Sequence, residues 1–221
     1  MQFFSYLING ISLGSVYALI ALGYTMVYGI AKMLNFAHGD VIMIGSYVVY
    51  FAFGASGLNP VLSIVLSMIV CTILGVVIER LAYRPLREAP SLAVLITAIG
   101  VSYLLQQVAQ LSWSSNPKSF TSVVSGMKPV SLFGGQLTIS AETIVTIVAC
   151  VVIMVVLMWF VNYTPAGHAM LAVSEDRGAA QLMGVNVNGT ISLTFAIGSA
   201  LAAIAGALLC SSYPTLQPTT G

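Results

Sequence analysis

The chain has 221 residues, of which 58% are hydrophobic and only 6% charged, and its mean hydropathy is +1.00. These values exclude an ordinary soluble domain and are typical of proteins that cross a membrane several times. The net charge of only +1 argues against a nucleic-acid partner.

Apolar runs long enough to cross a hydrocarbon core of about 30 Å recur along the chain. We expect one all-α membrane domain over residues 1–221, a polytopic helix bundle with about six transmembrane segments at 3–31, 41–53, 61–78, 91–111, 143–161 and 191–209. The run at 41–53 is short for a full crossing, so it is tilted, extended through Ala55 or partly re-entrant. The N-terminus lies outside if this run crosses and inside if it is bent back, and the sequence leaves both open.

The arginines predict the orientation of the bundle. Residues 79–90 form an expected short loop with Arg80, Arg84 and Arg87, and the charged stretch at 164–190 must lie on the same side because two crossings separate them. Since short loops rich in Lys and Arg stay in the cytoplasm, we expect both segments to be cytoplasmic. Residues 112–141 then form an extracytoplasmic loop, in which 130–133 and 136–139 flank Gly134 and Gly135 as a possible hairpin.

Small residues at four-residue spacing predict close helix packing. The last apolar run has two such ridges, which indicate burial among helices rather than contact with lipid: Gly198, Ala202 and Gly206, and beside them Ser199, Ala203 and Ala207. The first run has one such ridge, which lets another helix approach closely: Gly10, Gly14 and Ala18.

A charged segment at residues 174–187, between two apolar runs, is the most informative stretch. It is built like a short surface helix, with an N-cap, an acidic first turn and a glycine exit at Ser174, Glu175, Asp176 and Gly184. Its apolar positions at i, i+3 and i+4 are Ala179, Leu182 and Met183, which gives the helix one apolar face. Such a helix predicts that a partner on the aqueous side binds it.

Two sets of polar residues within the apolar runs are candidates for a translocation pathway, because polar groups are costly there. Asn35, His38 and Asp40 lie between the first two runs, either at a broken helix that Asn35 caps and that faces a water-filled path, or at a simple aqueous boundary. Ser102, Gln106 and Gln110 form a stripe down one face of the fourth run, which either lines a path or hydrogen-bonds to neighbouring helices.

Enzymatic readings have little support. The string from Gly10 to Gly14 matches the G-x-S-x-G nucleophile motif around Ser12, but that motif requires a strand–turn–helix and here lies inside an apolar run. The sequence has no P-loop and no cluster typical of a metal site, so we expect no catalytic residues, no metal and no cofactor in this chain.

Several motifs together resemble a known family. The string EDRGAAQLMGVNV, with NFAHGD at 35–40 and GYTMVYG at 23–29, is similar to the permeases of bacterial branched-chain amino acid ABC importers, and within them to the smaller, LivH-like subunit. The resemblance implies a type II-like importer permease in a bacterial inner membrane that pairs with a second permease subunit, two ATP-binding subunits that carry the ATP, and an extracytoplasmic solute-binding protein. It also implies a coupling helix that docks on an ATP-binding subunit through Glu175, Asp176, Arg177, Ala179, Ala180, Leu182, Met183 and Gly184.

The chain departs from that family in two ways. Gly178 stands where many relatives carry an acidic or larger polar residue, and relatives continue for several tens of residues beyond Tyr213, so we expect a C-terminally truncated chain. Two alternatives to branched-chain amino acid import are a related permease for urea or short amides and an ion-coupled secondary transporter or channel. The second would require buried ionisable pairs, for which His38 and Asp40 are the candidates.

Overall fold

The computed structural model describes residues 2–87, 89–124, 130–132 and 137–220. Its helices are α1 (Gln2–Ala31), α2 (His38–Val49), η1 (Tyr50–Ala55), α3 (Pro60–Ile78), η2 (Glu79–Tyr83), η3 (Arg84–Leu86), α4 (Ser91–Trp113), α5 (Ala141–Tyr163), α6 (Pro165–Glu175), α7 (Arg177–Leu182) and α8 (Val187–Ser212). Four short strands complete it: β1 (Lys118–Ser119), β2 (Val130–Leu132), β3 (Leu137–Ile139) and β4 (Thr215–Leu216).

The predicted class, a helical polytopic membrane bundle, is confirmed. Within the described residues, 5 helical stretches are long and apolar enough to cross a membrane: α1, α3 with its continuation through η3, α4, α5 and α8. The expected short second segment is the 12-residue α2, which continues into the π-helical η1. Most side chains of α2 are buried, so it is an interior helix of the bundle.

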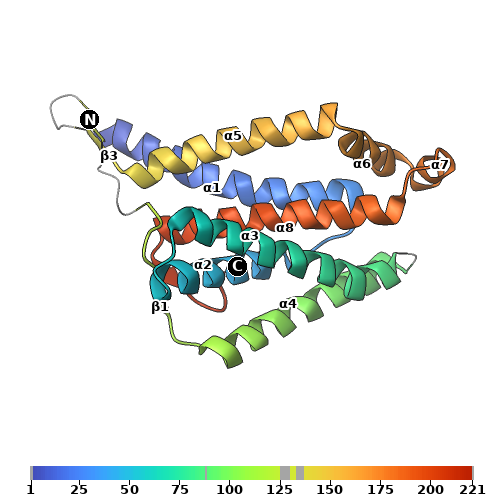
Figure 1. Ribbon diagram of the computed structural model, residues 1–221, viewed down its shortest axis with the longest axis horizontal. Helices are drawn as coiled ribbons and strands as arrows, with labels where there is room; N and C mark the ends of the chain where they lie inside the picture. Colours follow the sequence, from blue (N-terminus) through green and yellow to red (C-terminus); the bar gives the residue numbers. More distant parts are fainter. Residues whose placement is uncertain (1, 88, 125–129, 133–136, 221) are drawn as a thin grey trace.

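Helix α8 occupies the centre of the bundle, with α1 and α3 on either side and α2 against it (Figure 1). Its small residues allow these contacts: a Cβ placed on Gly206 would lie 2.6 Å from the backbone oxygen of Ile42 in α2, and one on Gly198 would lie 2.9 Å from Val27 Cγ2 in α1. Both ridges predicted for this helix are buried, and the expected interior position is confirmed.

The similar ridge on α1 has a different environment. A Cβ placed on Gly10 or Gly14 would meet nothing within 4 Å, and both residues and Ala18 are exposed. No helix of the described residues packs against this ridge, although its small residues would let one approach closely. The pattern fixes only that a close approach is sterically possible, and α1 packs instead through the face that bears Val16 and Leu19, both fully buried.

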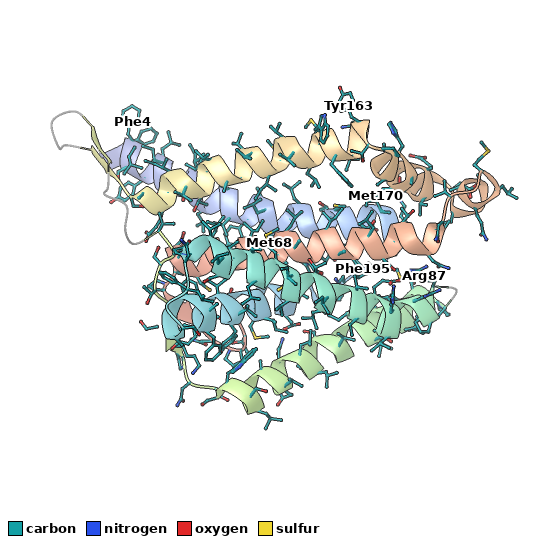
Figure 2. All side chains as sticks on the ribbon, viewed as in Figure 1. Phe4, Met68, Arg87, Tyr163, Met170 and Phe195 are labelled. Carbon is teal, nitrogen blue, oxygen red and sulfur yellow. The ribbon has the colours of Figure 1, made fainter. Side chains whose placement is uncertain are left out.

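The outer helices present apolar side chains to their surroundings (Figure 2). On α5, Val155 and Trp159 are more than half exposed, and so are Leu92 and Leu104 on α4. Because these faces are apolar and unpaired within the bundle, they suit contact with lipid tails.

The segment after α3 differs from the expected loop. The helix continues as a π-turn in η2 and a 3-10 turn in η3, so the non-helical connection begins only after Leu86. The prediction failed because Glu79 and Tyr83, one turn apart, are both fully buried and extend the interior face of α3, while Arg80 and Arg84 point outward. The prediction from charged residues alone therefore placed the end of this helix too early.

The two ends of the bundle carry different elements (Figure 1). Helices α6 and α7 and the connection from η3 to α4 lie at one end, and β2 and β3 lie at the other. Strands β2 and β3 pair antiparallel with Leu132 opposite Leu137, and the expected turn residues Gly134 and Gly135 lie outside the described residues. After α8 the chain folds back, so that β4 pairs with β1 and Leu216 is fully buried.

Candidate functional site

Helix α7 lies at one end of the bundle, and it contains or directly adjoins the residues expected to couple to a partner. Ser174 does not cap it, contrary to the prediction, because α6 already begins at Pro165 and includes Ser174 in its last turn, where the hydroxyl donates to the Leu171 carbonyl at 2.7 Å. Glu175 ends α6. The cap of α7 is Asp176, whose carboxylate accepts the backbone N–H groups of Gly178 at 2.7 Å and Ala179 at 3.0 Å.

The exit from α7 is the one predicted. Gly184 has φ of +85°, a left-handed conformation that residues with a side chain adopt only with strain. Its N–H donates to the Gln181 carbonyl at 3.0 Å, and the N–H of Val185 donates to the Ala180 carbonyl at 3.0 Å. These two bonds form a Schellman motif, which ends the helix sharply and returns the chain to α8.

The exposed face of α7 is apolar. Leu182 is 90% exposed and Met183 is 85% exposed, with Ala179 exposed on the same surface. Ala180, expected on the partner-facing side, is 4% exposed and packs against the bundle. A large aliphatic pair that protrudes into water at the end of a helix is unfavourable unless another surface covers it.

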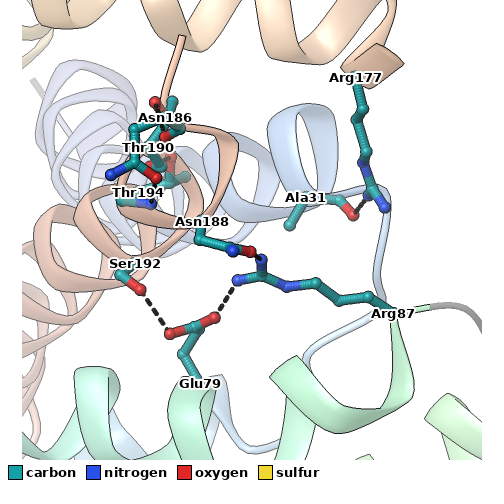
Figure 3. A network of polar contacts seen from close by, with 10 residues as sticks. Ala31, Glu79, Arg87, Arg177, Asn186, Asn188, Thr190, Ser192 and Thr194 are labelled. Atoms are coloured by element: carbon teal, nitrogen blue, oxygen red, sulfur yellow. Dashed lines mark hydrogen bonds and ion pairs between the residues drawn. The ribbon is translucent and has the colours of Figure 1, made fainter. Parts of the chain in front are cut away.

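Polar contacts hold this end of the bundle together (Figure 3). Glu79 in η2 is fully buried and forms an ion pair with Arg87, and its other oxygen accepts the Ser192 hydroxyl of α8 at 2.6 Å. Arg87 also donates to the Asn188 side chain. Arg177, half-buried at the start of α7, donates to the backbone carbonyl of Ala31 at the end of α1. The contacts of Glu79 and Arg87 therefore join η2 to α8, and the separate contact of Arg177 joins α7 to α1.

The break between α1 and α2 contains Asn35, but not as the predicted cap. The N-cap of α2 is Ala37, which makes no side-chain capping bond, and only the backbone carbonyl of Asn35 accepts from His38 N–H at 3.2 Å. The Asn35 side chain is turned inward instead, where its Oδ1 accepts the hydroxyl of buried Tyr83 at 2.9 Å. The break is thereby anchored to η2.

His38 lines a cavity of about 530 Å³ between α1, α2 and the tail after α8. The histidine is 4% exposed, and its Nε2 has no hydrogen-bond partner among the described residues. Gly23 of α1 makes room for the ring, since a Cβ there would lie 2.9 Å from His38 Cε1. Asn35 and Tyr24 line the same cavity, which is otherwise mostly apolar.

Asp40 belongs to a second polar group. Its Oδ1 accepts from Gln106 Nε2 of α4 at 2.9 Å, and the same amide lies 3.3 Å from the Ser102 hydroxyl. The structure thus joins two sets that the sequence treated separately. His38 and Asp40 diverge because residues two apart on a helix point to different faces. Gln110, half-buried on α4, is not in this network.

Sequence reasoning missed Glu79, Tyr83 and Ser192. A signal for the first two was present, because Glu79 and Tyr83 follow an apolar run at the i, i+4 spacing of one helix face. Nothing in the sequence pairs Ser192 with Glu79, since they are 113 positions apart.

Ser12 lies inside the continuous helix α1, so the strand–turn–helix of a nucleophile elbow is not formed there. It lines a cavity of about 230 Å³ together with Glu142, an acidic neighbour that the sequence did not place there. Neither His38 nor His168 lines this cavity. A serine with a carboxylate but no base between them lacks the usual activation of a nucleophile.

Comparisons with known proteins agree with this architecture. Residues 6–221 match the family model described as branched-chain amino acid transport system / permease component. The high-affinity branched-chain amino acid transport system permease protein BraD of Pseudomonas aeruginosa is 42% identical over 97% of this chain and 73% of its own length. The permease protein LivH of the same description is 40% identical in Salmonella typhimurium and 39% in Escherichia coli, each over 100% of this chain and 75% of the relative. No solved structure matches the chain.

Proposed function

The chain belongs to the family of branched-chain amino acid transport system permease components, and we propose that it is the membrane-spanning subunit of an ATP-driven importer for those amino acids. Transport permeases, not enzymes, are the relatives it resembles. These relatives favour this function over urea or short-amide import and over ion-coupled transport. In the bacterial inner membrane, this subunit works with a second permease, two ATP-binding subunits and an extracytoplasmic solute-binding protein.

The exposed apolar end of α7 is the observation that carries the coupling role. Leu182 and Met183 protrude from a short helix whose start is fixed by Asp176 and whose exit is fixed by Gly184. A short, well-capped helix whose exposed end is apolar fits a hydrophobic groove on a soluble partner. The hydrogen bond from Arg177 to the Ala31 carbonyl links α7 to the end of α1. A displacement of α7 therefore moves the end of α1, next to the break that contains Asn35 and ends at His38. Motion driven by ATP in a partner is thereby transmitted to the pathway.

The coupling role predicts the behaviour of a double variant. Leu182→Ala with Met183→Ala removes the apolar tip without touching the bundle, so membrane insertion stays unchanged while co-purification of the ATP-binding subunits falls at least tenfold. The measurement is the ratio of subunits recovered on a tagged chain. Leu111→Ala is the control, since Leu111 is 87% exposed at the end of α4 far from α7. Undiminished recovery in the double variant would exclude α7 as the coupling helix.

We place the translocation pathway beside α2, with Asn35 and His38 on one side and Asp40, Ser102, Gln106 and Gln110 on the other. The cavity beside His38 has a size typical of small-ligand sites and a mostly apolar lining with a few polar groups. That combination suits an amino acid whose side chain is aliphatic and whose backbone end is charged. His38, which lines the cavity, is the residue that we propose to hydrogen-bond the charged end.

His38→Ala tests this placement. Removing one hydrogen bond to the substrate lowers leucine uptake by the reconstituted importer about tenfold, which corresponds to about 1.4 kcal/mol. Subunit recovery stays near that of the parent, and uptake is normalised to the recovered complex because loss of this buried side chain also lowers the melting temperature. His168→Ala is the matched control, because His168 is exposed on α6 and lines no part of the cavity. Equal uptake in both variants would show that the break between α1 and α2 has only a structural role and does not bind the substrate.

A further inference from the structure

A second cavity, of about 360 Å³, lies at the end of the bundle that carries α7, and three basic side chains line it. Lys32 follows α1, Arg87 follows η3 and Arg177 begins α7, so three separate parts of the chain bring their charges to one place. Figure 3 shows the two arginines approaching from different elements. The cavity shares no lining residue with the one beside His38.

The positive charge of this cavity is only partly balanced. Glu79 neutralises Arg87, and the C-terminal end of α1, whose Ala31 carbonyl accepts from Arg177, contributes about half a negative charge. Among the described residues that line the cavity, the charged side chains are all basic, and Glu79 and the end of α1 offset their charge only in part. Burial lowers the pKa of the Arg177 guanidinium and nearby Arg87 lowers it further, as expected for like charges held close together.

Some hydrogen-bond donors at the cavity have no partner within the part of the chain that the structure describes. The buried Arg87 Nε has none among the described residues. Ser91 lines the cavity at the start of the 23-residue α4, whose N-cap is Pro90 and makes no side-chain capping bond, whereas the N–H of neighbouring Ala89 donates to the Leu86 carbonyl at 3.1 Å. The free N–H groups and the positive end of a helix attract anions, and phosphate groups commonly bind where such an end meets basic side chains.

The remaining wall of the cavity is apolar and includes Leu34, Val94 and Leu95. Since α1 ends and α4 begins here, and both are long and apolar enough to cross a membrane, the cavity lies at the level where lipid headgroups meet acyl chains. Basic pockets between membrane helices at this depth bind anionic headgroups. We propose that this cavity binds a phosphate group, that of an anionic membrane lipid such as phosphatidylglycerol. The cavity shares no lining residue with the proposed pathway, but Arg177 of α7 belongs both to it and to the proposed coupling contact.

Lipid retention by the purified chain tests the proposal. The protein is equilibrated in detergent with equal amounts of phosphatidylglycerol and phosphatidylcholine, and bound lipids are counted by native mass spectrometry. We expect preferential retention of phosphatidylglycerol, with a loss of about fivefold in Lys32→Gln and a further fivefold when Arg177→Gln is added. Lys32 is the better first target because its side chain is exposed. Arg80→Gln and Arg84→Gln are controls, since both arginines are exposed and neither lines the cavity.

A competition experiment distinguishes a lipid headgroup from free inorganic phosphate as the ligand. Displacement of the lipid by millimolar inorganic phosphate supports a phosphate site and assigns it to the free ion, whereas retention of the lipid assigns it to the headgroup. Equal retention of phosphatidylglycerol in the parent, Lys32→Gln and the double variant overturns the proposal. A second outcome also overturns the proposal: Lys32→Gln retains lipid normally, but the ATP-binding subunits no longer co-purify with it. The cavity would then belong to a protein interface.

Discussion

Replacing Glu79 with Met lowers the stability of the bundle by about 3–5 kcal/mol. The reason is that Arg87, whose side chain is only 11% exposed, keeps its charge but loses the carboxylate that neutralises it, and Ser192 loses its acceptor. The loss is measured as a shift in the unfolding curve in detergent. It is the largest effect that we expect from a single substitution, because buried and unpaired charges are among the costliest groups in a folded protein.

A double variant distinguishes the cost of the orphaned charge from the value of the pair. Glu79→Met combined with Arg87→Met removes both charges and leaves apolar side chains of similar length, so most of the lost stability returns. Arg84→Met, next to the pair in sequence but exposed, changes stability by less than about 1 kcal/mol. A double variant as unstable as Glu79→Met alone would show that the network stabilises through its hydrogen bonds rather than its charge balance.

Gly206→Ala is expected to cost about 2–3 kcal/mol. The added methyl would lie 2.6 Å from both the Ile42 carbonyl oxygen and Ser46 Oγ, so α2 and α8 must move apart. A backbone atom on the neighbouring helix cannot relax by a change of rotamer, which makes this glycine less tolerant than one beside a flexible side chain. The melting temperature of the purified protein is the measurement.

The same substitution on α1 is the control. Gly14→Ala places its methyl where nothing lies within 4 Å, and alanine favours the helix over glycine by roughly 1 kcal/mol. The variant is therefore neutral or slightly more stable than the parent. Equal losses at Gly14 and Gly206 would contradict the central position of α8.

These two glycines show how far sequence patterns determine the fold. The four-residue spacing of Gly10, Gly14 and Ala18 is the same as that of Gly198, Ala202 and Gly206, yet the first ridge is exposed and the second is packed against neighbouring helices. Hydropathy and length were sufficient to predict five of the six expected segments as spans, because the membrane imposes both, whereas the run at 41–53 became the buried α2 with η1. Which helix becomes the central one depends on the fit of several surfaces at once, which no local pattern contains.

The candidate site was predictable in part for the same reason. The exit of α7 at Gly184 followed from local chemistry, since a left-handed residue after a short helix favours glycine. The start of the helix did not, because Ser174 and Asp176 are both good caps and the choice between them depends on α6. The contact of Asp40 with Gln106 spans 66 positions and is formed by packing of α2 against α4.

The central place of α8 has a consequence for biosynthesis. The faces of α1, α2 and α3 that receive it are made first and have no occupant until the ribosome has delivered residues 187–212, far later in translation. In the nascent chain these helices therefore lie in the bilayer without tight packing against one another. The bundle packs only late, through contacts between residues far apart in the sequence. Variants that weaken the α8 contacts should accumulate as inserted but protease-sensitive chains rather than fail at the insertion step.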